Sequence, residues 1–166
     1  MLGANMSALQ HLVPNEGGGT MDRLTELSQL VVSCWRVAVP ERPIPTSHGV
    51  LDRALNDVCL AEGFPEWARK HLHFVVSRVG LQCVELPAIL DRAQKAQLTT
   101  APNPSYSVTE PRITPETALR FLRKLSIPEA DAMEWGKTLA SAARRAEDEL
   151  ASFERARASS AAAQAE

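Results

Sequence analysis

Apolar residues recur at helical spacing along almost the whole chain. In residues 22–39 they follow an i, i+3, i+4, i+7 pattern, which places them on one stripe of a helix and leaves polar residues on the opposite side. The same pattern returns in residues 47–63, 65–79, 87–98, 114–125 and 126–158. We therefore predict an all-α fold class for this protein.

The first four of these segments predict a helical bundle over residues 21–98. Proline and glycine mark the expected helix ends: Pro40 follows the first helix, Gly63 ends the second and Gly80 ends the third. Whether residues 81–84, which connect the third helix to the fourth, are extended stays open.

Residues 99–113 separate this bundle from the rest of the chain. They contain three prolines and few apolar side chains, which is typical of a linker or of a functional loop. Tyr106, the only tyrosine of the chain, lies in the middle of the segment. An aromatic side chain in such a loop is a candidate contact for a partner.

The C-terminal part, residues 114–158, predicts a helical hairpin with a long final arm. Ser126 and Glu129 match a capping box, in which a serine at the helix start and a glutamate three residues later bond to the backbone N–H groups. The helix that follows is expected to end near Ala158, a length of about 45 Å. Residues 159–166 are expected to form a disordered tail.

This final helix carries a seam of small and apolar residues. They recur at alternating spacings of four and three, as in a heptad pattern: Ala132, Gly136, Leu139, Ala143, Ala146, Leu150 and Phe153. The small members permit another helix to approach closely. The helix over residues 114–125 is too short to cover the whole seam. Three partners stay open for the uncovered part: the N-terminal bundle, a second copy of the chain, or another protein.

Composition limits the classes of function. The chain carries 18 Lys and Arg against 20 Asp and Glu, and its net charge of −2 argues against strong binding to a polyanion. Its three cysteines lie among apolar neighbours with no short spacing, so buried reduced thiols are expected. No signal-peptide pattern and no stretch of about 20 apolar residues is present. We expect a cytoplasmic protein without a membrane partner.

Residues 1–20 predict a flexible N-terminal arm, since a run of three glycines precedes Met21. The codons for Glu-Gly-Gly are purine-rich, so this run also fits a ribosome-binding sequence read as protein. Whether translation starts at Met1 or at Met21 stays open, and the intact mass of the native protein decides it.

The chain shows no pattern of catalytic or metal-binding residues. His71 and His73 are two residues apart, so on a helix they point in directions about 200° apart and cannot share one metal ion. Cys-x-x-Cys, His-Glu-x-x-His and Gly-x-Ser-x-Gly motifs are absent, and the glycine run lacks the lysine of a phosphate-binding loop. We predict no catalytic residues, no metal site and no cofactor.

Nucleic-acid binding is an alternative. The helices over residues 49–79 are spaced like a helix-turn-helix, and Arg69 and Lys70 lie on the second of them. Residues 21–98 nevertheless carry nine basic and nine acidic residues, so this region has no positive excess for phosphate binding. Further candidates for contact with an anion or nucleic acid share one helix face through their i, i+3, i+4 spacing: Arg120, Arg123 and Lys124.

These observations favour a non-catalytic protein–protein interaction module, such as an adaptor, assembly or regulatory subunit. It is expected to bind a protein partner, or a second copy of itself, through exposed helical surface. The predicted contact residues are Tyr106, Leu139, Leu150 and Phe153. The first alternative is a small DNA-associated regulator that uses residues 49–79. The second is an enzyme whose site is assembled from residues distant in sequence.

Overall fold

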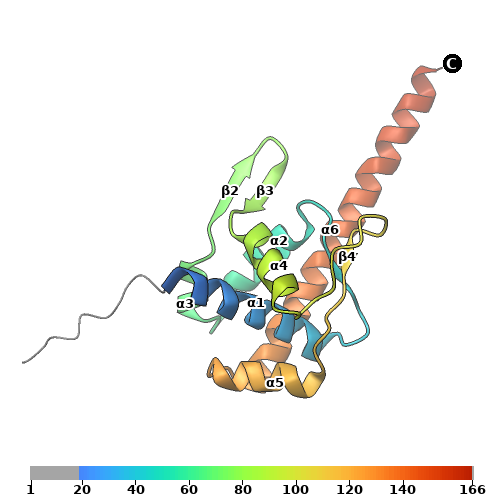
Figure 1. The fold of residues 1–166 in the computed structure, drawn as a ribbon. Coiled ribbons are helices and arrows are strands. Elements are labelled where there is room, and N and C mark those ends of the chain that lie inside the picture. Colours follow the sequence, from blue (N-terminus) through green and yellow to red (C-terminus); the bar gives the residue numbers. More distant parts are fainter. Residues whose placement is uncertain (1–18, 166) are drawn as a thin grey trace, which may run out of the picture.

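A computed structural model describes residues 19–165 of this protein. The predicted N-terminal arm, residues 1–20, lies outside the described residues except for Gly19 and Thr20, which belong to the first helix. The described chain is mostly helical, as the periodicity predicts (Figure 1). No helix in this part of the chain is long and apolar enough to cross a membrane.

The described residues form six helices and four short strands. In chain order the elements are α1 Gly19–Ala38, β1 Ile44–Pro45, α2 Val50–Cys59, α3 Glu66–Lys70, β2 Phe74–Ser77, β3 Gly80–Cys83, α4 Leu86–Lys95, β4 Val108–Thr109, α5 Pro115–Lys124 and α6 Glu129–Gln164. The helices α1, α2, α4 and α5 lie close to their predicted positions. Thr114 caps α5, because its hydroxyl accepts a hydrogen bond from the Thr117 backbone N–H at 3.1 Å.

Helix α1 is the centre of the fold and packs against α4, α5 and α6, while α2 packs against α6 (Figure 1). Trp35 of α1 is fully buried, and its indole N–H donates to the Arg42 carbonyl at 2.9 Å. One hydrophobic core contains residues from both sides of the segment 99–113. The N-terminal helices and the helices α5 and α6 therefore share one apolar interior.

The first half of the α6 seam is covered within the chain itself. Its first five positions, from Ala132 to Ala146, are buried. At Gly136, α6 lies so close to α1 that an added Cβ would be 2.0 Å from the Cys34 carbonyl oxygen of α1. The close approach that the small residues predict therefore takes place between α6 and α1.

The predicted third helix, residues 65–79, is wrong. Helix α3 ends at Lys70, and an antiparallel β-hairpin of β2 and β3 follows, with Phe74 opposite Cys83 and Ser77 opposite Gly80. The run that begins at Phe74 is rich in residues that favour strands, and Gly80 adopts a φ of 106° that other residues rarely tolerate. Residues 81–84, left open by the sequence, are mostly strand β3.

Helix α6 differs from its prediction at both ends. Ser126 has a φ of 59° and Pro128 is the N-cap, so the predicted capping box is not formed. At the other end the helix continues to Gln164, so a disordered tail over residues 159–164 is wrong. That stretch is rich in alanine, the residue with the highest helix propensity, which favours continuation of the helix.

The segment 99–113 is fastened to the body of the protein. Its strand β4 pairs with β1, with Ile44 opposite Thr109. The hydroxyl of Thr109 is buried and donates to the Thr100 carbonyl at 2.6 Å, and the segment ends at the buried Ile113. The sequence left a linker and a functional loop open for these residues. A segment that pairs with the body in this way is a loop and not a linker between separate domains.

Candidate partner-binding surface

The hairpin of β2 and β3 is held in place by the buried carboxylate of Asp52 on α2. One oxygen accepts a hydrogen bond from the Cys83 backbone N–H at 2.7 Å, and the other accepts from the Gly49 backbone N–H at 3.1 Å. A single side chain thus joins the start of α2 to the end of β3. Charge-assisted hydrogen bonds of this kind are stronger than neutral ones, so the hairpin has a defined position on the body.

A second contact closes the base of the hairpin. The carboxylate of Glu85 accepts from the His73 backbone N–H at 2.8 Å, and its other oxygen lies 2.5 Å from the His73 ring nitrogen Nδ1. The Val84 backbone N–H donates to the His73 carbonyl at 2.9 Å. Burial raises the pKa of Glu85, but the hydrogen bonds from His73 outweigh it and hold this pKa below its ordinary value.

This shift gives a pH-dependent prediction for Glu85→Gln. A lowered pKa in the folded state stabilises the fold above the pKa of an unfolded glutamate, about 4.3, and this contribution is lost as the pH falls through the lowered value. We expect the variant to have a lower free energy of unfolding than the wild type at pH 7, with the difference shrinking toward pH 3. Urea unfolding at several pH values measures it, with Glu62→Gln at an exposed acid as the control. A difference independent of pH contradicts the assignment.

The hairpin presents large apolar side chains to solvent. Val76 is 84% exposed and Val79 is 64% exposed, and Val75 and Val84 are exposed as well. A two-stranded sheet is only marginally stable by itself in water and needs its apolar side chains for its own packing. Several exposed valines on such a hairpin are therefore unusual.

Helix α6 leaves the body beside this hairpin. From residue 147 onward all its residues are exposed, and we call residues 147–164 the arm. On the arm, Leu150 is 38% exposed and Phe153 is 68% exposed. The hairpin and the arm protrude on the same side of the molecule (Figure 1).

The tip of the hairpin and the root of the arm lie next to each other. A cavity of about 80 Å³ between them is lined by Val79 and Leu81 of the hairpin and by Ala146 and Leu150 of α6. The apolar side chains at the tip of the hairpin and at the root of the arm thus belong to one region. Val76 pairs with Leu81 across the hairpin, and Phe153 follows Leu150 by one helical turn. We call Val76, Val79, Leu81, Leu150 and Phe153 together the hairpin–arm surface.

Three ion pairs fix the direction of α6 where it leaves the body. Arg145 donates to Asp57 of α2 at 2.9 Å. Arg42 lies 3.6 Å from Glu147, and Arg53 of α2 pairs with Glu149. Exposed pairs of this kind contribute little to stability, so their structural effect is to orient the helix.

A larger pocket of about 470 Å³ lies on the other side of the hairpin, between α2 and α4. Most of its lining is apolar, and its polar groups include Asp52, His48 and Cys83. Both oxygens of Asp52 are engaged by backbone N–H groups, and burial raises the pKa of the Cys83 thiol to about 12. This thiol is therefore protonated and unreactive at neutral pH. No three His, Cys, Asp or Glu side chains gather as a metal site among residues 19–165.

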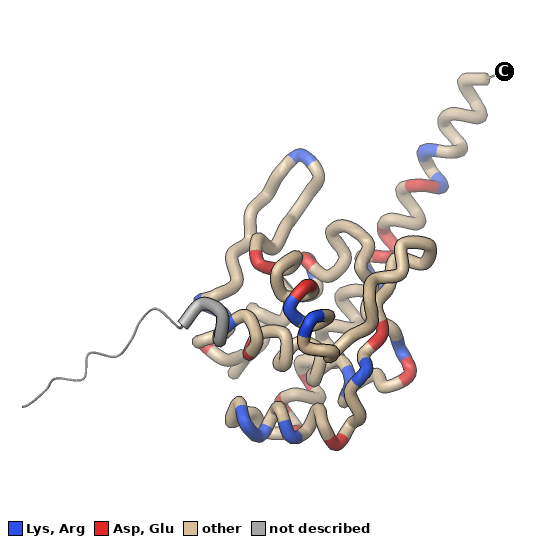
Figure 2. Tube along the Cα trace, in the orientation of Figure 1, with Lys and Arg blue, Asp and Glu red and all other residues tan. Residues whose placement is uncertain are grey.

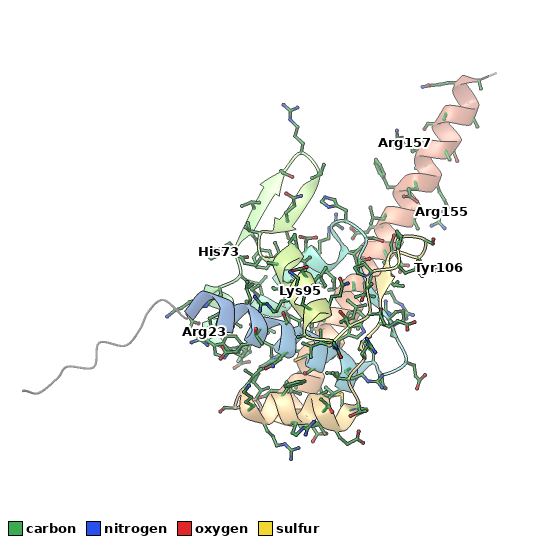
Figure 3. The ribbon with its side chains drawn as sticks, in the orientation of Figure 1. Arg23, His73, Lys95, Tyr106, Arg155 and Arg157 are labelled. Carbon is green, nitrogen blue, oxygen red and sulfur yellow. The ribbon has the colours of Figure 1, made fainter. Side chains whose placement is uncertain are left out.

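The predicted contact residues lie in different places. Leu150 and Phe153 are exposed on the arm, and Tyr106 is 76% exposed on the loop before β4 (Figure 3). Leu139 is only 2% exposed and packs in the core, so the structure corrects its assignment as a contact for a partner. The reason is that α1 and α2 of the same chain already cover this part of the seam.

The candidates for nucleic-acid contact are not brought together. A helix-turn-helix over residues 49–79 is not formed, because α3 has only five residues. Arg69 donates to the Cys59 carbonyl at 2.9 Å and to the Ala61 carbonyl at 3.3 Å, so its guanidinium stabilises the end of α2. Lys70 is exposed at the end of α3. The remaining three candidates lie exposed on α5: Arg120, Arg123 and Lys124. Figure 2 shows basic residues along this helix.

The hairpin is the part of this surface that sequence reasoning missed. A signal was present in the run Phe74-Val75-Val76, which favours a strand, and in Gly80, which favours a turn.

Comparison of the chain with protein-family models, with curated proteins and with solved structures finds no match.

Proposed function

We propose that this protein is a non-catalytic protein–protein interaction module that binds its partner through the hairpin–arm surface. The observation that carries the proposal is the exposure of Leu150 and Phe153 on a helix that leaves the body next to exposed hairpin valines. Neighbouring large apolar side chains on two protruding elements are unfavourable in water, and covering them stabilises a complex.

The composition of the surface supports a protein as the partner. Its centre consists of aliphatic side chains and one phenylalanine, and the ion pair of Arg53 and Glu149 lies beside it. An apolar centre with a charged rim is typical of protein–protein interfaces, whereas a surface for nucleic acid requires a positive excess.

Capture from extract of the source cells tests this function. The tagged chain is compared with Val79→Asp and Phe153→Asp, after nuclease treatment, and the retained proteins are quantified. We expect the wild type to retain a protein in stoichiometric amount and both variants to retain less than about a tenth of it, because a buried carboxylate disrupts an apolar interface.

The control is Leu60→Asp, which places the same charge on an exposed apolar residue outside the hairpin–arm surface. This variant is expected to retain the same protein as the wild type. Equal retention by all three variants contradicts the proposed function, as does loss of the retained material on nuclease treatment.

A further inference from the structure

Beyond Leu150, no ion pair or side-chain hydrogen bond joins the arm to the rest of the described chain. Helix α6 is buried on one side up to Ala146 and is exposed on every side over residues 147–164. At 1.5 Å per residue the arm is about 27 Å long. A helix of this length is only marginally stable alone in water, so pairing with another helix stabilises it.

The stripe that continues the seam has an uncommon composition. Beyond Ala146 the four-three spacing places Leu150, Phe153, Arg157 and Ser160 on one side of the arm, and then Gln164. Among the described residues Arg157 has no ion-pair partner. A guanidinium on such a stripe is stabilised when an aromatic ring and a carboxylate of another helix face it.

We infer that this stripe pairs in antiparallel orientation with the same stripe of a second copy of the chain. The inference deepens the proposed function and rests on it, since it names the partner of the arm. The spacing of the stripe allows a register in which Leu150 of one arm lies opposite the partner's Ser160 and Phe153 lies opposite the partner's Arg157.

This register brings complementary groups together. Phe153 of one arm then lies opposite the partner's Arg157. The guanidinium of that arginine also faces Glu154, which follows Phe153 on the first arm. The two-fold symmetry of a dimer repeats both contacts.

The charges disfavour a parallel pair in register. Parallel arms in register place Arg157 opposite the partner's Arg157 and bring Glu149 near the partner's Glu154, so like charges meet at both points. The arm points away from the body, with Arg155 and Arg157 on its exposed part (Figure 3). Antiparallel arms therefore leave the two bodies at opposite ends of the pair.

Sedimentation equilibrium of the full chain tests the pairing. We expect the wild type to form a dimer below about 100 µM. Phe153→Asp is expected to raise the dissociation constant about a hundredfold, and Arg157→Glu about tenfold, because a glutamate there faces the partner's Glu154. Arg155→Glu makes the same charge change on the outer side of the arm and is expected to change the dissociation constant by less than about twofold.

Cysteine cross-linking tests the orientation. Ala156 lies near the two-fold axis of the antiparallel pair, and Ala163 lies seven residues further on the same side of the helix. We expect Ala156→Cys to form an intermolecular disulfide under mild oxidation and Ala163→Cys to form none. The three native cysteines are buried and serve as the background in the unmodified chain.

A wild type that stays monomeric above about 100 µM overturns the inference, and so do equal cross-linking yields at the two positions. If the wild type is monomeric but Phe153→Asp still loses a captured protein from cell extract, the proposed function holds and the inferred partner is wrong. If the capture experiment fails as well, both are wrong.

Discussion

Replacing Gly136 with alanine is expected to lower the free energy of unfolding by about 2 to 3 kcal/mol. Alanine has the higher helix propensity, which by itself favours the variant by about 1 kcal/mol. The added Cβ, however, would lie 2.0 Å from the Cys34 carbonyl oxygen and 2.5 Å from the Ala38 Cβ. Neither atom belongs to a flexible side chain, so α1 and α6 have to separate and the core they share loosens.

Urea unfolding monitored by circular dichroism measures the effect of Gly136→Ala. Ser141→Ala is the matched control, because it introduces the same residue at an exposed position of the same helix. This control is expected to leave stability unchanged or to raise it by about half a kcal/mol. A Gly136→Ala variant as stable as the control contradicts the close packing of α6 on α1.

The second large effect is expected from Leu139→Asp, with a loss of about 4 kcal/mol or more. Leu139 is 2% exposed between α6 and its neighbours, so the change removes a buried side chain and places a carboxylate in the core. Leu150→Asp makes the same substitution on the same seam, eleven residues further along. Leu150 is 38% exposed at the edge of a cavity, so the loss of stability on its replacement is expected to stay within about 1 kcal/mol.

Thermal and urea unfolding of the two aspartate variants measure the loss of stability at a core position and at a surface position of the same helix. The pair also controls the binding experiments, since Leu150→Asp is expected to stay folded while it weakens association. Equal destabilisation by the two substitutions contradicts the division of the seam at Ala146.

The helices were predictable because their signals are local. The stripe of α1, the proline-led start of α5 with its Thr114 cap, and the seam of α6 all follow from residues within a few turns of one another. The hairpin was not predictable in the same way. Val75, Val76 and Val79 fit a helical stripe that continues from Trp67, and the same residues also fit a strand.

What decides between helix and strand there is a contact with a distant part of the chain. Asp52 lies 31 residues before Cys83, yet its carboxylate accepts the hydrogen bond that positions β3 on α2. The candidate surface was predicted in part for a similar reason. Leu150 and Phe153 were assigned from the seam, whereas the exclusion of Leu139 depends on how far α1 and α2 extend along α6.

The sequence by itself determined the helical class, the places of most helices and the continuous seam of the last one, because helical periodicity is a property of neighbouring residues. Only the tertiary structure decided where along that seam the protein's own core ends and its free surface begins. That boundary, at Ala146, depends on helices that lie far away in the chain and close in space.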